Sequence, residues 1–197
     1  MTDLVTTSTT ASTDGTLSQE RQDWLDTLRA HRNFLRTTAR DLTDEQATTR
    51  STVSALTVAG IIKHVTQGER QWAKFAVAGA AAFDGEPWVG LDWEGFAALY
   101  DAGENVAEDY ENRFELSDGE TLASVLADYE AVAARTDELV ATLDLDAVQP
   151  LPIAPWHEPG SAWSVRRALA HIVAETAQHA GHADIIRESI DGAKTMG

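Results

Sequence analysis

Residues 163–191, WSVRRALAHIVAETAQHAGHADIIRESID, contain four polar side chains at intervals that a helix brings onto one face. His171, Glu175, His179 and His182 are spaced by four, four and three residues. Because each residue of a helix turns the chain by about 100°, these side chains fall within an arc of about 80°. The spacing predicts a helix and restricts its packing, since a carboxylate and three imidazoles need polar partners wherever they are buried.

Apolar side chains lie in or beside the same arc, which predicts that the arc faces the protein interior. They are Ala168, Ile172 and Ile186. A divalent metal is the simplest group that would satisfy the polar side chains of this arc. The alternative is a metal-free network of histidine and glutamate with a purely structural role, which is less favoured because four such groups are difficult to satisfy mutually.

Four amphipathic segments with helical periodicity cover most of the chain, and no segment has a convincing strand pattern. The predicted long helices span residues 18–42, 58–79, 121–143 and 164–191. We therefore predict an all-α fold, a four-helix bundle that forms one domain over residues 18–192. The Thr/Ser-rich residues 1–17 have too little apolar surface to fold alone and are predicted to be a disordered tail, and residues 193–197 to be a short C-terminal tail.

Capping motifs indicate where the helices begin and end. Residues 43–46 and 117–120 both fit the pattern S/T-x-x-E/Q of a capping box. The first predicts a short helical turn, and the second predicts the beginning of the third long helix. Ser164 is a suitable N-cap for the fourth helix, and Gly192 is a suitable residue for its C-terminal cap.

The connection between the second and third long helices is itself long and contains many aromatic residues. Residues 83–117 carry Trp, Tyr and Phe among acidic residues and glycines, with a short helix predicted over residues 93–105. Connections of this length are often functional, and this one fits a bundle with one crossover. Its aromatic side chains either form the wall of a pocket or cover one end of the bundle. A second, proline-rich loop spans residues 146–161.

Charge and cysteine content restrict the function further. The net charge is -17, with Asp+Glu 32 against Lys+Arg 15, and such a surface would repel nucleic acid and anionic membranes. The chain has no cysteine, so any thiol chemistry requires a thiol that arrives as a substrate. Without an apolar run that could span a bilayer or an apolar N-terminal leader, the expected location is the cytoplasm.

A three-residue metal site can be assembled from two of the predicted helices. Glu175 and His179 stand at positions i and i+4, a spacing that lets two side chains hold one metal ion. His64 lies on the apolar stripe of the second helix, one turn after Ile61, and would supply a third ligand. Two nitrogens and a carboxylate suit zinc in a catalytic site, where a fourth position stays open for water or substrate. Nickel or iron would suit the same set.

Two segments of the chain resemble the DinB-like superfamily of metal-binding four-helix bundles. One is LTVAGIIKHVTQGERQW, which contains His64, and the other is WSVRRALAHIVAETAQHAGHADIIRESIDG near the C-terminus. The second is similar to an H-x-x-E-E-x-x-R-H-x-G-H-A-D pattern from an actinobacterial branch of unknown function. Ala174 and Gln178 replace the usual glutamate and arginine of that pattern. The resemblance covers most of residues 20–192.

The resemblance implies a ligand set and a reaction class. Mycothiol-dependent maleylpyruvate isomerase, a related protein, has a His, Glu, His set that corresponds by position to His64, Glu175 and His179. The implied activity is that of a metal-dependent S-transferase or isomerase, which binds a small-molecule thiol of the mycothiol type and adds its thiolate to an electrophile. The alternative is a non-catalytic metal-binding or stress-response module. The resemblance also implies a homodimer.

Two further histidines of the C-terminal segment have predicted roles beside the ligands. His182 is expected to be a catalytic acid/base group, and its alternatives are direct metal ligation or a supporting contact to a ligand. His171, one turn before Glu175, is expected to orient that carboxylate.

Overall fold

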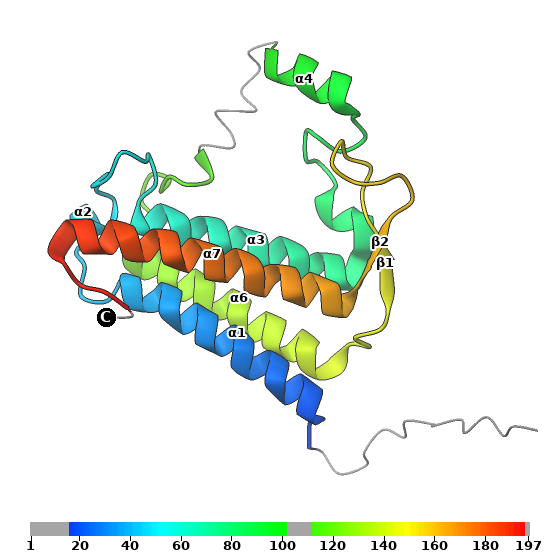
Figure 1. The fold of residues 1–197 in the computed structure, drawn as a ribbon, viewed down its shortest axis with the longest axis horizontal. Coiled ribbons are helices and arrows are strands. Elements are labelled where there is room, and N and C mark those ends of the chain that lie inside the picture. Colours follow the sequence, from blue (N-terminus) through cyan, green and yellow to red (C-terminus); the bar gives the residue numbers. More distant parts are fainter. Residues whose placement is uncertain (1–15, 102–111, 196–197) are drawn as a thin grey trace, which may run out of the picture.

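The computed structural model describes residues 16–101 and 112–195, and the described chain is mostly helical, as predicted. Four long helices lie side by side (Figure 1): α1 (Gln19–Thr38), α3 (Val58–Ala78), α6 (Leu122–Thr142) and α7 (Val165–Asp191). Helix α7 packs against α1 and α3, and α6 packs against the same two helices. This arrangement encloses one core between the four helices.

Shorter elements connect the long helices. They are α2 (Asp44–Ala47), the 3-10 helix η1 (Gly79–Phe83), α4 (Trp93–Asp101), β1 (Val148–Pro150) and β2 (Ala162–Ser164). Helix α4 lies apart from the four long helices, on the side of α3 that faces away from α1 (Figure 1). The predicted short helix over residues 93–105 is thus present over its described part, and residues 102–105 lie outside the described residues.

Most of the predicted helix ends agree with the structure. The hydroxyl of Thr43 accepts a hydrogen bond from the backbone N–H of Gln46, which completes the capping box of α2. The Ser164 hydroxyl caps α7, and Gly192 ends it with a φ of 78°. Helix α1 ends at Thr38, four residues before the predicted position, and the chain then turns at Asp41 with a φ of 63°.

The prediction that the capping box at residues 117–120 opens the third long helix was wrong. The backbone N–H of Ser117 donates to Glu120, so part of the box forms, but α6 begins only after Thr121, which forms a capping box with Ser124. Gly119 between them has a φ of 84°, a left-handed conformation that interrupts a right-handed helix. The first box therefore closes a turn that precedes the helix.

The proline-rich loop is closed by two short strands that no strand pattern in the sequence revealed, and the fold is otherwise helical, consistent with the predicted all-α class. Strands β1 and β2 pair antiparallel, with Val148 opposite Ser164 and Pro150 opposite Ala162. Three residues per strand are too few to produce a recognisable alternation in the sequence. The pairing holds Trp163 at the N-terminal end of α7, beside the candidate site described below.

A layer of buried polar side chains divides the core. One apolar cluster contains Leu35, Val65 and Ala180, and a second contains Leu28 and Ile172. Between them lie buried polar residues from all four long helices: Arg32, Glu69, Thr136 and Thr176. The helices therefore bring together polar groups whose desolvation has to be offset by mutual pairing.

The remaining described segments lie at the ends of the chain. Thr16 and Leu17 are exposed and precede α1, and residues 1–15, most of the predicted N-terminal tail, lie outside the described residues. At the other end, the backbone N–H of Thr195 donates to Asp184, so the chain folds back along α7. None of the described helices is long and apolar enough to cross a membrane.

Candidate metal centre

His64 on α3 faces α7 with its ring held between aromatic neighbours. Its imidazole stacks on Phe114 with the ring centroids 4.0 Å apart and an interplanar angle of 19°. The ring of His179 on α7 meets it edge-on at 4.9 Å. Since α3 and α7 pack along their length, the two histidines approach each other from different helices, as the sequence predicted.

The structure brings the three predicted ligands together. One ligand atom from each of His64, Glu175 and His179 can be chosen so that all three lie within 4.8 Å of one another. Within α7, the Nε2 atom of His179 lies 3.6 Å from a carboxylate oxygen of Glu175. On the other side of that carboxylate, His171 Nε2 lies 3.9 Å from the second oxygen. Two imidazoles thus flank Glu175. We call His64, Glu175 and His179 the triad, and His171 lies outside it.

The surroundings of the site favour the protonation states that bind metal. Burial, followed by the charge of the neighbouring His179, lowers the pKa of His64 to about 4. Burial also lowers the pKa of His171, and the interaction with His179 lowers that of the Glu175 carboxyl. At neutral pH the site therefore presents neutral imidazole at His64 and a carboxylate at Glu175, the forms in which these side chains act as ligands.

The residues present fit a divalent metal ion. Two imidazoles and a carboxylate form a donor set typical of catalytic zinc, with positions left for other ligands. The His179 ring is also short of polar partners, because its Nδ1 atom is buried and has no hydrogen bond to a described residue. A buried ring nitrogen without a partner is uncommon, and a metal ion or a buried water molecule would satisfy it.

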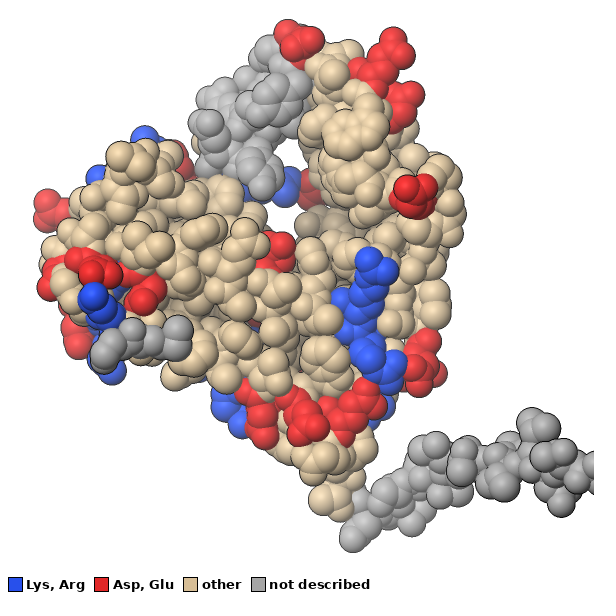
Figure 2. All heavy atoms as spheres, in the orientation of Figure 1, with Lys and Arg blue, Asp and Glu red and all other residues tan. Residues whose placement is uncertain are grey.

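A cavity of about 200 Å³ lies directly against the three residues. Besides the triad, it is lined by side chains that include Trp72, Arg113 and His171. A volume of this size is below the usual range for a whole drug-sized ligand, so the cavity fits a small molecule or one end of a larger one. In Figure 2 the surface is hollowed between the long helices and the part of the chain that carries α4.

The polar arc of α7 is less buried than predicted. The side chains of Glu175, His171 and His179 are 42%, 29% and 12% exposed, and His182 is exposed. The buried face of α7 is centred on Ile172 and on small residues that the sequence reading passed over: Thr176, Ala180 and Ala183. That centre is rotated by about 100° from the polar arc, so the arc borders the core and faces the cavity.

His182 does not line the cavity. Its ring centroid lies 5.6 Å from that of His179, on the solvent side of α7. The sequence reading also missed several residues of the site: Glu69, Arg113 and Phe114. Phe114 had been considered only among aromatics of the long connection, and nothing in the local pattern distinguishes Arg113 from a solvated surface arginine.

A close approach between two segments holds Phe114 against His64. Gly60, one turn before His64, allows the backbone of Phe114 to reach α3, since a Cβ atom at Gly60 would lie 1.8 Å from the Phe114 carbonyl oxygen. We predict that Gly60→Ala lowers the free energy of unfolding by about 1–3 kcal/mol and weakens metal binding, because Phe114 must move away from the His64 ring. Urea denaturation and zinc titration measure the two effects.

Gly181→Ala on α7 is the matched control. A Cβ atom there has no neighbour within 4 Å, so alanine should raise the stability of this helix by about 0.5–1 kcal/mol. A Gly60→Ala variant that is at least as stable as the wild type would show that the contact with Phe114 is not tight.

Comparison with known protein families gives a match over most of the chain. No curated protein matches the chain significantly. A family model described as mycothiol-S-transferase matches residues 23–192, nearly the same range as the resemblance found in the sequence, and confirms a DinB-like relationship. The chain belongs to the mycothiol-S-transferase family.

Proposed function

We propose that this protein is a metal-dependent enzyme that transfers a small-molecule thiol of the mycothiol type to an electrophile. One observation carries the proposal: His64, Glu175 and His179 converge beside a cavity in a chain that has no cysteine. A site of this kind needs an external thiol for thiol chemistry, and the family description names such a thiol.

We also propose that the four long helices form a DinB-type four-helix bundle with its crossover between α3 and α6. The mutual packing of α1, α3, α6 and α7 supports this, and the long connection over residues 83–117 has the expected position. The bundle would supply the rigid support that keeps ligands from α3 and α7 in register. The homodimer and the cytoplasmic location expected from the sequence stay predictions.

Zinc is the proposed metal, with nickel or iron as alternatives, and His64, Glu175 and His179 would hold it. When bound, the metal would lower the pKa of a thiol, so that a thiolate is available at neutral pH. The other residues act by position. His171 orients the Glu175 carboxylate, and Trp72 provides an apolar wall that excludes water from the reacting sulfur.

The proposed reaction breaks the S–H bond of the thiol and joins its sulfur to an electrophilic carbon. In a transfer, the leaving group departs with the electron pair of the bond that it had to this carbon. In an addition to a conjugated double bond, the electron pair moves to the adjacent carbon, which takes up a proton, and later elimination of the thiol would give an isomerase. We propose that the thiol proton passes through water to His182, which lies outside the cavity, is exposed and can release the proton to solvent.

The direct test is the conjugation of mycothiol to 1-chloro-2,4-dinitrobenzene, and the absorbance of the thioether product measures its rate. The metal-loaded protein should accelerate the reaction, and removal of the metal by a chelator should abolish that acceleration. Glu175→Gln, which keeps the side-chain volume but removes a charged ligand, should lose it as well. If the protein binds metal but conjugates neither mycothiol nor other small thiols, the non-catalytic metal-binding or stress-response module becomes the better description.

A further inference from the structure

Almost every cationic side chain of this acidic protein pairs with a carboxylate. Three of them make no ion pair with a described residue: Arg21, Lys74 and Arg167. Arg21 donates instead to the backbone carbonyls of Val140 and Leu143. Lys74 is exposed beside a different groove, which Arg70 and Asp128 also line.

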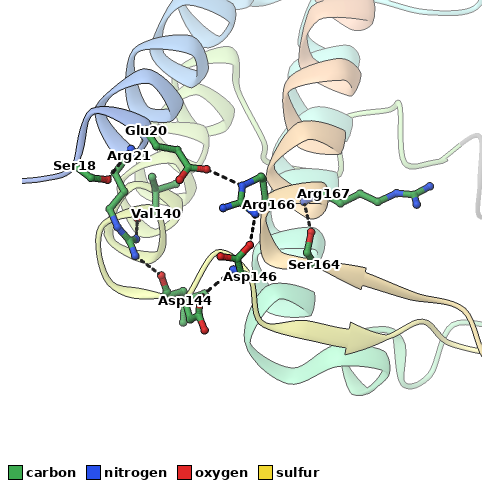
Figure 3. A network of polar contacts seen from close by, with 10 residues as sticks. Ser18, Glu20, Arg21, Val140, Asp144, Asp146, Ser164, Arg166 and Arg167 are labelled. Atoms are coloured by element: carbon green, nitrogen blue, oxygen red, sulfur yellow. Dashed lines mark hydrogen bonds and ion pairs between the residues drawn. The ribbon is translucent and has the colours of Figure 1, made fainter. Parts of the chain in front are cut away.

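Arg167 keeps its charge available next to the metal centre. It is exposed, and its side chain makes no hydrogen bond to a described residue. This is unusual in a chain that contains 32 Asp and Glu residues. Its neighbour Arg166 behaves in the opposite way and pairs with both Glu20 and Asp146. Figure 3 shows the Arg167 side chain extending away from that network, on the other side of α7.

An aromatic stack connects Arg167 to the cavity. The guanidinium carbon lies 4.4 Å from the ring centroid of Trp163, which is a cation–π distance. Trp163 stacks on Trp72 at 4.8 Å with an interplanar angle of 16°, and Trp72 lines the cavity and contacts His171 at 4.5 Å. The cation, the two indoles and the metal ligands therefore border one continuous surface.

The spacing along α7 gives the length of that surface. Arg167, His171 and Glu175 follow at intervals of four residues, so they lie on one side of the helix. The eight residues from Arg167 to Glu175 correspond to about 12 Å of helix. The small cavity at the triad would accept the reacting end of a substrate, and the rest of the molecule would lie across the indole surface toward Arg167.

An exposed guanidinium on an indole face is suited to a carboxylate. Its planar fork can donate two parallel hydrogen bonds to the carboxylate, and the ring beneath it limits its movement. The net charge of -17 would otherwise repel an anionic substrate, so an anion could bind productively only beside a local cation.

We propose that Arg167, resting on Trp163, binds a carboxylate of the substrate, and that this site prefers substrates with an anionic group about two helical turns from the reacting atom. The kinetic part of this proposal rests on the proposed function, whereas binding of the carboxylate at Arg167 does not require turnover. An anion bound at Arg167 belongs either to the electrophile or to the thiol.

The kinetic test compares 4-[(4-chloro-3,5-dinitrobenzoyl)amino]benzoate, whose carboxylate lies about two helical turns from the reacting carbon, with its neutral carboxamide as electrophiles for mycothiol. In the wild type, kcat/KM should favour the carboxylate, and Arg167→Met should reduce this preference by at least about tenfold while still covering Trp163. Arg167→Lys should restore part of it. Lys74→Met, which removes the same charge elsewhere, should leave both the preference and the basal rate unchanged. A second pair, 4-[(3-sulfanylpropanoyl)amino]benzoate and its carboxamide, shows whether the carboxylate lies on the thiol.

A binding experiment keeps the inference separate from the enzyme proposal. Unreactive 3,5-dinitrobenzoate and 3,5-dinitrobenzamide are titrated against the metal-loaded protein, with quenching of tryptophan fluorescence as the signal. Tighter binding of the carboxylate that is lost in Arg167→Met supports the inference even if no turnover is found. Equal binding of the acid and the amide by the wild type, or an unchanged preference in Arg167→Met, would overturn it.

Discussion

Replacing either His64 or His179 by alanine is expected to abolish stoichiometric metal binding. Each change leaves two of the three ligands, and a site with one imidazole and one carboxylate does not retain zinc against exchange with solvent. Both side chains are only partly buried, so the fold should persist and the circular dichroism spectrum should stay helical. Metal content is measured by mass spectrometry after equilibration with one equivalent of zinc and removal of free ion.

Two histidines outside the triad serve as controls. His31 on α1 lies outside the cavity, and His31→Ala should keep its full metal content. His182→Ala should also keep the metal but turn over more slowly, because its predicted role is proton transfer. Full metal content in His64→Ala or His179→Ala would rule out the triad, and loss of metal in His182→Ala would make His182 a ligand.

Arg32→Met is expected to have the largest effect on stability. Arg32 Nη2 lies 2.5 Å from Glu69 Oε1, with both side chains almost fully buried, and Nη1 donates to Asp137 at 2.7 Å. Removing the guanidinium leaves the Glu69 carboxylate inside the core without its partner, at a cost of about 3–5 kcal/mol. Urea denaturation of the metal-free protein measures the loss. Since Glu69 also lines the cavity, metal affinity should fall too.

A double variant and a surface pair test the cause. Adding Glu69→Leu to Arg32→Met removes the stranded charge, and much of the lost stability should return. Arg29→Met breaks an exposed pair with Asp26 and should cost less than about 1 kcal/mol. If Arg32→Met lowers the free energy of unfolding no more than Arg29→Met does, the Glu69 carboxylate must be accessible to water in the folded protein.

Helical periodicity and spacing predicted the elements that hold the site. The three proposed ligands were selected because Glu175 and His179 stand one turn apart and because His64 interrupts an apolar stripe, and the structure places them close together. Thr43 and Ser164 were recognised as caps because the capping interaction is local, within three residues.

Features that depend on distant contacts were not predictable in this way. Arg32 and Glu69 pair across 37 positions, and a periodicity argument assigns both to the surface because charged residues are seldom buried. The polar arc of α7 does not face the core, because small residues such as Thr176 are buried in its place. Their burial results from close packing of the helices, which hydropathy does not predict. The stack of Arg167 on Trp163 likewise requires the β1–β2 pairing that positions the indole.

We propose above all that His64, Glu175 and His179 bind a divalent metal that takes part in the proposed thiol reaction. The most direct measurement is elemental analysis of the wild-type protein purified without chelator or affinity-tag metal. We predict about one zinc, nickel or iron ion per chain, held by the triad and lost in His179→Ala. A protein that contains no metal, and takes up none when reconstituted with these ions, would contradict the claim and leave the triad as a structural network.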